Sequence, residues 1–313
     1  MDEAIGRWLA GFPGRTDFLV GVSGGRDSMV LLDAMVRGGF SRLVVCHLNH
    51  GLRGRESAGD AAFVRRRAKA LGLGFESAKA DTRGYAAESG KSLELAAREL
   101  RHVFFSECAV RRRCRRIVLA HHADDQVETC LHHFLRGTGA AGLAGMRGVA
   151  RVGGLTIFRP LLGVRRADID AQAVRLGIVH REDGSNSDRV HTRNALRHDV
   201  LPAIERAVGK SFYGAILRTA AILRQEDEWL ESCVPELPGR IPCRVLRELP
   251  EALRARAVHR WLGRRGVSEP GFAETQRVLS LLDPDDGPAK VNLPGNLHAR
   301  RRAGLIFLER GKR

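Results

Sequence analysis

The chain has 313 residues and a formal net charge of +16, because 52 Lys and Arg side chains outnumber 36 Asp and Glu. This length is sufficient for about two domains with a sizeable core. The arginine excess points to a polyanionic partner, although a GC-rich genome would give part of the same bias. Aromatic residues make up only 5%, too few for base stacking as the main binding mode.

Cysteine usage and hydropathy exclude several classes of protein. No two of the six cysteines form a C-x-x-C pair, no signal peptide is recognisable, and no apolar run approaches membrane-spanning length. We therefore expect a reduced, cytoplasmic protein without a disulfide framework, a zinc ribbon or a membrane anchor.

Apolar runs alternate with helical patterns through the first half of the chain. The order β-α-β-α predicts an α/β fold with a doubly wound parallel sheet and right-handed crossovers, in which ligands bind at the carboxyl ends of the strands. The expected strands are 18–22, 43–48, 75–80 and 117–120, and the expected helices are 29–37, 58–71, 93–111 and 125–135.

A glycine-rich loop follows the first expected strand, where residues 23–28 read Ser-Gly-Gly-Arg-Asp-Ser. The glycines let the backbone approach an anion, and a helix beginning near Ser28 directs its N-terminal N–H groups at phosphates. The loop is not a Walker A motif, since Arg26 and Asp27 stand where Gly-Lys-Ser/Thr would be needed. A carboxylate facing phosphate requires a cation, so Asp27 predicts Mg²⁺ beside the nucleotide. The nucleotide-binding residues predicted in this loop are Ser23, Gly24, Gly25, Arg26, Asp27 and Ser28.

Two weaker signals accompany this loop. Residues 49–53 read Asn-His-Gly-Leu-Arg after the second expected strand, and from there His50 and Arg53 could reach the nucleotide. On the polar face of the third expected helix, Arg98 has two possible roles. One is an ion pair with Glu94 at helical spacing, which composition favours, and the other is a contact with phosphate.

An acidic cluster follows the fourth expected strand, where residues 121–128 read His-His-Ala-Asp-Asp-Gln-Val-Glu. Asp124 and Asp125 suit a helix N-terminus electrostatically, and Glu128 lies one turn further on. Capping explains one of these carboxylates but not the group. Three carboxylates at one strand end fit a metal ion or a cationic substrate.

The second half of the chain is organised differently. A glycine-rich stretch at 136–146 predicts a loop that closes over substrate. A polar, basic segment at 183–202 joins the two regions, and it contains Arg193, Asn194 and Arg197. We therefore predict two domains, residues 1–202 and 203–313.

The second domain is predicted to be smaller and mainly helical, with a terminal strand pair. A group of arginines lies in one helical stretch, where we expect contacts with nucleic-acid phosphates. These arginines are Arg254, Arg256, Arg260, Arg264 and Arg265. The expected elements are a helix over 201–230, a linker at 235–242, two or more helices within 243–283, and strands at 290–293 and 297–308 around a turn at 294–296.

Together these motifs resemble the tRNA(Ile)-lysidine synthetases, a family of PP-loop N-type ATP pyrophosphatases. The shared segments, in the family's order, read SGGRDS, NHGLRG, SLELAARELR, HHADDQVET, LRGTGAAGLAGM, RPLL and, over 185–202, SN…RN..R…LP. The resemblance implies a PP-loop, adenine nucleotide α-hydrolase-like fold and an ATP-dependent carbon–nitrogen ligase. In that reaction ATP adenylates C2–O of the wobble cytidine in the CAU anticodon of tRNA(Ile), and the ε-amine of free lysine displaces AMP. The product, lysidine, changes codon and amino-acid specificity from methionine to isoleucine.

The resemblance also implies roles for individual residues. ATP would bind residues 23–28 with His50 and Arg53, and Asp27 would hold Mg²⁺. The catalytic residues would be Asp27, Arg98 and Asp125. Cationic lysine would bind Asp125 and Glu128, and the tRNA would bind Arg193, Asn194 and Arg197.

Three other functions are compatible with parts of the sequence. A PP-loop tRNA thiolase would also adenylate a base, but it usually needs paired cysteines or an iron–sulfur site. An ATP-dependent amidating ligase would need a source of ammonia, for which no domain is visible. An RNA-binding module with an idle nucleotide pocket would have no use for an intact Asp27 and Glu128. Either a monomer or a homodimer is compatible with the sequence.

Overall fold

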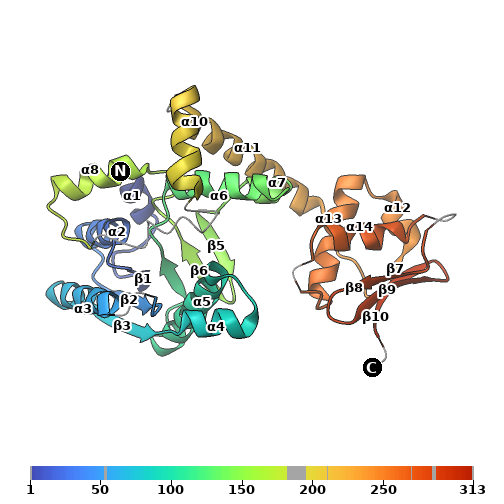
Figure 1. Ribbon diagram of the computed structural model, residues 1–313, viewed down its shortest axis with the longest axis horizontal. Coiled ribbons are helices and arrows are strands. Elements are labelled where there is room, and N and C mark those ends of the chain that lie inside the picture. Colours follow the sequence, from blue (N-terminus) through green and yellow to red (C-terminus); the bar gives the residue numbers. More distant parts are fainter. Residues whose placement is uncertain are drawn as a thin grey trace. The chain divides into compact units, whose positions relative to one another are not determined.

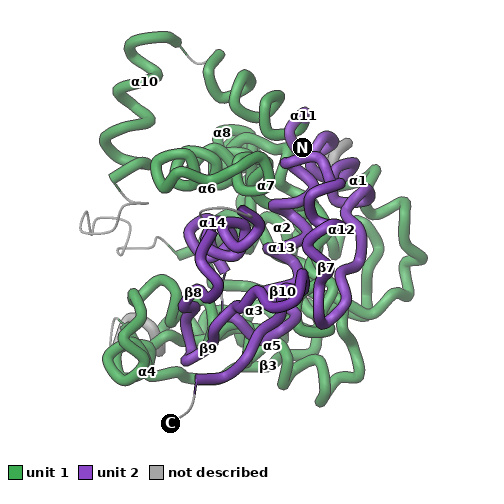
Figure 2. Tube along the Cα trace, turned by 90° about the vertical axis from the view of Figure 1, so that its right-hand side faces the viewer, with its two compact units in different colours: residues 1–221 green, residues 222–313 purple. Residues whose placement is uncertain are grey.

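The computed structural model describes residues 2–52, 55–181, 195–209, 211–268, 270–283 and 287–311. The chain divides into two compact units, residues 1–221 and 222–313 (Figure 2). The division falls inside one helix, α11 (Ser211–Cys233), whereas the sequence placed a domain boundary after residue 202. Arg53, Arg193 and Asn194, which the sequence assigned to binding sites, lie outside the described residues.

Unit 1 is built on a six-stranded sheet in the order β3-β2-β1-β4-β6-β5 (Figure 1). All neighbouring strands are parallel except β5, which pairs antiparallel with β6 at one edge. Strand order reverses at β1, so the switch point of the sheet lies between β1 and β4. The strands are β1 Phe18–Gly21, β2 Leu43–Asn49, β3 Gly74–Lys79, β4 Arg116–Val118, β5 Val149–Val152 and β6 Leu155–Phe158.

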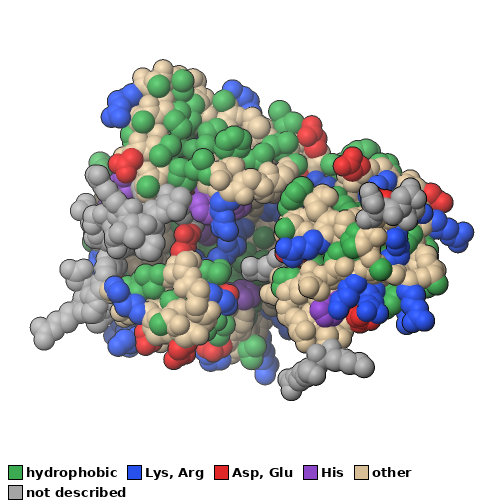
Figure 3. All heavy atoms as spheres, turned by 45° about the vertical axis from the view of Figure 1, so that its right-hand side comes forward, with side chains coloured by type: hydrophobic (Ala, Val, Ile, Leu, Met, Phe, Trp, Pro, Cys, Tyr) green, Lys and Arg blue, Asp and Glu red, His purple; other side chains and the backbone are tan. Residues whose placement is uncertain are grey.

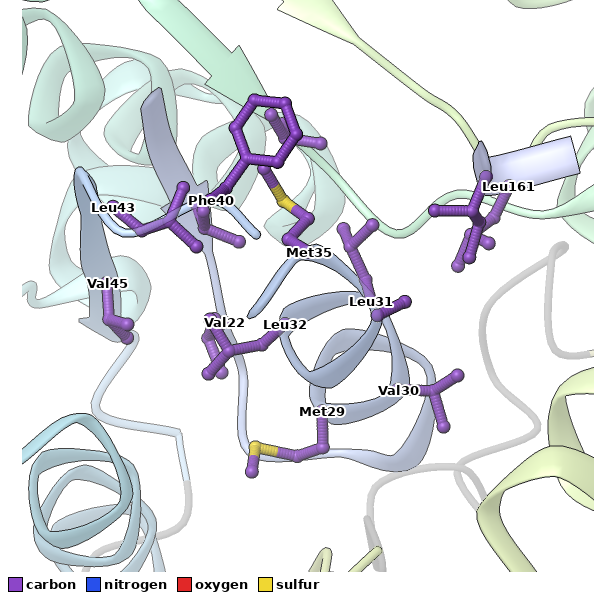
Figure 4. Close-up of a cluster of buried hydrophobic side chains, with 14 of the residues drawn as sticks. Val22, Met29, Val30, Leu31, Leu32, Met35, Phe40, Leu43, Val45 and Leu161 are labelled. Atoms are coloured by element: carbon purple, nitrogen blue, oxygen red, sulfur yellow. The ribbon is translucent and has the colours of Figure 1, made fainter. Parts of the chain in front are cut away.

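The two faces of this sheet carry different hydrophobic clusters, as expected for a doubly wound fold. In β1, Phe18 and Val20 belong to one cluster. Met29 and Met35 of α2 belong to the same cluster (Figure 4). Between Phe18 and Val20, Leu19 faces the other cluster with Phe104 of α5. Because side chains alternate along a strand, this split requires helices on both faces. The predicted doubly wound parallel sheet is therefore confirmed.

The helices of unit 1 begin close to the predicted positions. Ser92 caps α5, since its hydroxyl accepts a hydrogen bond from the Leu95 amide at 3.3 Å. The helical segments are α1 Asp2–Leu9, α2 Arg26–Arg37, α3 Arg55–Ala70, α4 Thr82–Ser89, α5 Leu93–Arg111, α6 Ala123–Leu135, α7 Ala140–Leu143, α8 Arg166–Arg175, the π-helical turn Leu196–Val200, α10 Leu201–Val208 and α11.

Unit 2 packs three helices on one face of a four-stranded antiparallel sheet. The strand order is β7-β10-β9-β8, and Trp261, Ala299 and Ile306 belong to its buried core. The expected strand 297–308 is in fact two strands, because Ala303 and Gly304 adopt positive φ angles of 49° and 75° and reverse the chain. The elements are α12 Cys243–Glu248, α13 Glu251–Arg264, α14 Phe272–Ser280, β7 Ile241–Pro242, β8 Lys290–Leu293, β9 Leu297–Arg302 and β10 Leu305–Arg310.

Within the described ranges, no helix combines the length and the apolar character that a bilayer crossing requires.

Candidate active site

The loop between β1 and α2 has the geometry of an anion site. Gly24 adopts a φ of +96°, a conformation that side chains other than glycine rarely take. The Ser28 hydroxyl donates to the Gly25 carbonyl at 2.8 Å and accepts from the Ser23 amide at 3.2 Å, which closes the loop on itself. No side chain within the described ranges caps α2, so the N–H groups of its first turn are available to a ligand at the switch point.

Asp27 lies in the first turn of α2 with its two carboxylate oxygens in different surroundings. Oδ2 accepts from Arg166 Nη1 at 3.4 Å and lies 3.8 Å from His122 Nε2. Oδ1 is buried and has no hydrogen-bond partner in the part of the chain that the structure describes. A buried, unsatisfied carboxylate oxygen beside a phosphate loop is a suitable ligand for Mg²⁺, so Asp27 fits one ligand position of the predicted ion. The described residues contain no group of three or more His, Cys, Asp or Glu side chains that could hold a metal by themselves.

Arg26 is braced by neighbouring elements. Its guanidinium donates to Asp170 Oδ1 of α8 at 2.6 Å and to His180 Nε2 at 3.1 Å. The next residue, Arg181, donates its amide to the Gly24 carbonyl at 3.0 Å. His180 and Arg181, which follow α8, therefore contact the phosphate loop directly and help to fix its position. This contact was not visible in the sequence, which assigned Arg26 to the nucleotide.

The start of α6 brings the acidic cluster next to the loop. His122 and Asp125 form a reciprocal cap: the Asp125 amide donates to His122 Nδ1 at 3.3 Å, and the His122 amide donates to Asp125 Oδ2 at 3.0 Å. The other ring nitrogen of His122 lies 3.8 Å from Asp27. His122 is 2% exposed and joins two predicted site residues, a role that the sequence did not reveal.

Asp124 has a structural partner of its own. Its carboxylate accepts two bonds of 3.1 Å from the Arg165 guanidinium and one of 2.8 Å from the Arg166 amide. Burial alone would raise the pKa of Asp124, but these hydrogen bonds lower it below its usual value. Asp125 and Glu128, by contrast, share an arginine partner.

That partner is Arg197, which the sequence assigned to tRNA. Its Nε donates to Glu128 Oε1 at 2.6 Å, and its Nη2 donates to Glu128 Oε2 at 2.9 Å and to Asp125 Oδ1 at 3.1 Å. Burial alone would lower the pKa of Arg197, but Glu128 and Asp125 raise it. The two carboxylates predicted to bind lysine thus already hold a cation.

Three arginines of unit 1, Arg98, Arg101 and Arg159, lie close enough for their charges to affect one another. Burial lowers the pKa of Arg159, and the positive charges of Arg98 and Arg101 lower it further. Arg159 Nε donates to His121 Nδ1 at 3.3 Å, and its Nη1 donates to a backbone carbonyl. Arg98 is exposed. The group suits an anionic ligand, and Arg159, which belongs to the RPLL segment, was missed as a candidate.

His50 lies close to this group. Burial lowers its pKa to about 4, and the positive charge of Arg101 acts in the same direction. Its Nδ1 lies 3.2 Å from Thr82 Oγ1. His50 is therefore a neutral hydrogen-bonding group at pH 7.

These features define a class of nucleotide-binding protein. A phosphate loop without a Walker lysine, at the switch point of a doubly wound sheet, is the arrangement of a PP-loop protein. The PP-loop domain model matches residues 3–204, and the model described as TilS substrate binding domain matches residues 242–307.

The relatives specify the family. The chain is 36% identical over 307 residues to the tRNA(Ile)-lysidine synthase of Solibacter usitatus, covering 92% of this chain and 67% of that protein. It is 37% identical over 288 residues to that of Bacillus subtilis, covering 87% and 61%. The chain therefore belongs to the tRNA(Ile)-lysidine synthase family. It spans about two thirds of the length of the relatives that it matches.

A similar fold is found in a solved structure of low sequence identity. The U34-tRNA thiolase NcsA from Methanococcus maripaludis superposes with a TM-score of 0.53 at 15% sequence identity, covering 71% of this chain and 78% of that one. At this identity the likeness concerns the fold alone.

Proposed function

We propose that the chain ligates L-lysine to C2 of the wobble cytidine in the CAU anticodon of tRNA(Ile), using ATP and releasing AMP and pyrophosphate. One observation carries the proposal: Asp125 and Glu128 hold a cationic group, and His122 connects that site to Asp27 in the phosphate loop. An amine site next to a phosphate site is what an adenylating amine ligase needs. Family membership supports the same reaction.

The first half of the reaction would take place at the loop. We assign the phosphates of ATP to residues 23–28 and the first turn of α2, with His50 and Arg53 as further contacts. The unsatisfied Oδ1 of Asp27 would hold Mg²⁺. Bound there, the ion would neutralise the charge of the departing pyrophosphate. Arg98 would contribute a positive charge toward the reacting phosphate.

Adenylation is needed because C2–O of cytidine is a poor leaving group. Once the oxygen carries AMP, the amine can displace it. The lysine ε-amine must lose a proton before it attacks. We assign the proton to Asp125, whose side chain is 19% exposed, while that of Glu128 is 3% exposed and suited to fixing the ammonium group.

Arg197 would contact different groups at two stages of the reaction. Without lysine it neutralises Asp125 and Glu128. When lysine takes these carboxylates, the guanidinium becomes available to a phosphate of the tRNA, together with Arg193 and Asn194. In this division of labour residues 1–202 bind ATP and catalyse, with tRNA contacts at the three residues just named, and residues 203–313 form the tRNA-binding region. The protein would act in the cytoplasm.

Sulfur transfer is not favoured as an alternative. Five of the six cysteines are buried free thiols, and only Cys233 is exposed. No C-x-x-C pair is present in the chain.

The proposal is tested by incubating the purified chain with radiolabelled lysine, ATP, Mg²⁺ and a tRNA(Ile) transcript with a CAU anticodon. We expect label to enter the RNA only when ATP is present, and not to enter a transcript whose wobble cytidine is replaced by uridine. Label in neither transcript, or equally in both, would reject the proposed substrate. The control protein is Asp27→Asn, which we expect to be inactive.

A further inference from the structure

Unit 2 has two basic surfaces, and they differ in how their charges are compensated. The first is α13, whose arginines the sequence favoured for RNA binding. Arg256 Nη1 lies 2.6 Å from Asp227 Oδ1. Arg260 donates to Glu231 at 3.0 Å, and Arg264 pairs with a glutamate that follows α11. Most of the charge on this helix is thus neutralised within unit 2.

The second basic surface is the solvent face of the four-stranded sheet. Ala299 of β9 and Ile306 of β10 are fully buried, so they mark the face that packs on the helices. The residues that alternate with them point to the opposite face. In the strand register, Lys290 lies opposite Arg300, and Arg300 lies opposite Phe307. These three side chains therefore form one row across β8, β9 and β10.

Arg240 extends the row at its other end. It immediately precedes β7, the strand that pairs with β10. Its guanidinium carbon lies 5.1 Å from the centroid of the Phe307 ring, and its side chain is exposed. An arginine held over an aromatic ring presents a flat, positively charged surface to solvent.

The charges on this face are poorly compensated. Glu309 pairs with Arg300 at 2.8 Å. Lys290, Arg302 and Arg240 are exposed, and none of them has an ion-pair partner in the part of the chain that is described. Among the described residues, four cations of this face thus have one carboxylate between them, in contrast to α13.

We propose that this surface, formed by Lys290, Arg300, Arg302, Phe307 and Arg240 and here called the sheet surface, is the RNA-contacting surface of unit 2. It would bind backbone phosphates of the tRNA on either side of an unpaired base. The inference rests on the proposed function, which supplies tRNA as the substrate. It replaces α13 as the expected contact.

The chemistry of the row fits RNA. Lysine and arginine side chains neutralise phosphates, and an unpaired base stacks on a guanidinium plane or an aromatic ring. Figure 3 shows several Lys and Arg side chains exposed over unit 2. A row of cations interrupted by one aromatic group provides both kinds of contact at neighbouring positions.

The test compares two variants of the full chain that each lose three positive charges. The sheet variant combines Lys290→Gln, Arg300→Gln and Arg302→Gln. The helix variant combines Arg260→Gln, Arg264→Gln and Arg265→Gln. Affinity for the tRNA(Ile) transcript is measured over a series of salt concentrations, and thermal unfolding verifies that both variants are folded.

We expect the sheet variant to bind tRNA roughly tenfold more weakly and to lose about three units from the slope of log K against log salt. Its KM for tRNA should rise while kcat at saturating tRNA stays unchanged. The helix variant should keep its affinity within about twofold. Phe307→Leu should weaken binding about fivefold without changing the salt slope, because it removes stacking and no charge.

The results separate this inference from the proposed function. A wild-type chain that forms no lysidine contradicts the function. An active wild-type chain whose sheet variant binds tRNA with wild-type affinity and salt slope overturns the inference alone. Loss of binding in the helix variant instead of the sheet variant would return the contact to α13.

Discussion

The two carboxylate oxygens of Asp27 differ in their contacts. Oδ2 faces Arg166 and His122, whereas Oδ1 is buried and no described residue forms a hydrogen bond with it. Asp27→Asn removes the charge and keeps the shape. We predict loss of AMP formation by at least about a hundredfold, with unchanged or slightly raised thermal stability because the unsatisfied charge is gone. AMP formation at the wild-type rate would remove Asp27 from the site.

Glu128 is the more buried of the two carboxylates that hold Arg197. Glu128→Gln weakens a buried ion pair, so we expect a stability loss of up to about 3 kcal/mol and a large rise in the KM for lysine. Pyrophosphate release during adenylation should be spared.

Asp227→Asn is the matched control, because it also breaks a buried carboxylate–arginine pair but in unit 2. It should lower stability without changing the KM for lysine. If both variants raised that KM equally, Glu128 would have only a structural role.

His50 gives the fold a pH dependence. Its pKa is about 4 in the folded chain and 6.5 in the unfolded chain, so between these values the unfolded state binds more protons. Stability should therefore fall as the pH decreases from 6.5 to 4, by at most about 3 kcal/mol from this group. His50→Gln should flatten that part of the curve in urea unfolding experiments. A variant with the same slope as wild type between pH 4 and 6.5 would contradict the shift.

The sequence singled out several candidate site residues but not the side chains that contact them. Asp27, Asp125 and Glu128 could be chosen because carboxylates at the ends of neighbouring parallel strands share one edge of the sheet. The pairing of Arg197 with Glu128 spans 69 positions, and no local pattern reveals it. His122 was visible only as part of a motif, since its role depends on the cap at the start of α6.

At the scale of elements, α8 and the segment after it support the phosphate loop. Arg26 is tied to Asp170 and His180, and the amide of Arg181 bonds to Gly24. If Arg26 only supports the loop through its contacts with Asp170 and His180, Arg26→Met and Asp170→Asn should each raise the KM for ATP several-fold. The double variant should be no worse than the single ones, because both remove the same contact.

The alternative is that Arg26 touches phosphate directly. In that case Arg26→Met should raise the KM for ATP far more than Asp170→Asn, and the two effects should add. Steady-state kinetics with varied ATP distinguish the two outcomes.

Element boundaries could be predicted where a single residue sets them. Ser92 has the side chain that an N-cap requires, and α5 begins directly after it. The reversal between β9 and β10 was missed because Ala303 adopts a positive φ, which alanine rarely does. Strand β7 was missed because it spans only two residues inside an apparent linker.

At the scale of the whole molecule, a single helix carries the chain from one unit to the next. The 23 residues of α11 begin in unit 1 and end in unit 2. No change of composition marks that point, so the sequence placed its boundary at the polar segment before residue 202 instead. The tRNA-binding role of this part of the chain was inferred from its positive charge. Which arginine and lysine side chains can contact RNA depends on the ion pairs that they form within the folded unit.

In the proposed function, one site couples ATP cleavage to amine transfer on RNA. This coupling is tested most directly by the ratio of lysine incorporated to AMP and pyrophosphate formed, with the CAU-anticodon transcript and all substrates present. We predict one lysine in the RNA for each AMP and each pyrophosphate, with the label recovered on the wobble nucleoside after digestion. ADP and phosphate as products, or AMP formed without lysine entering the RNA, would contradict the account.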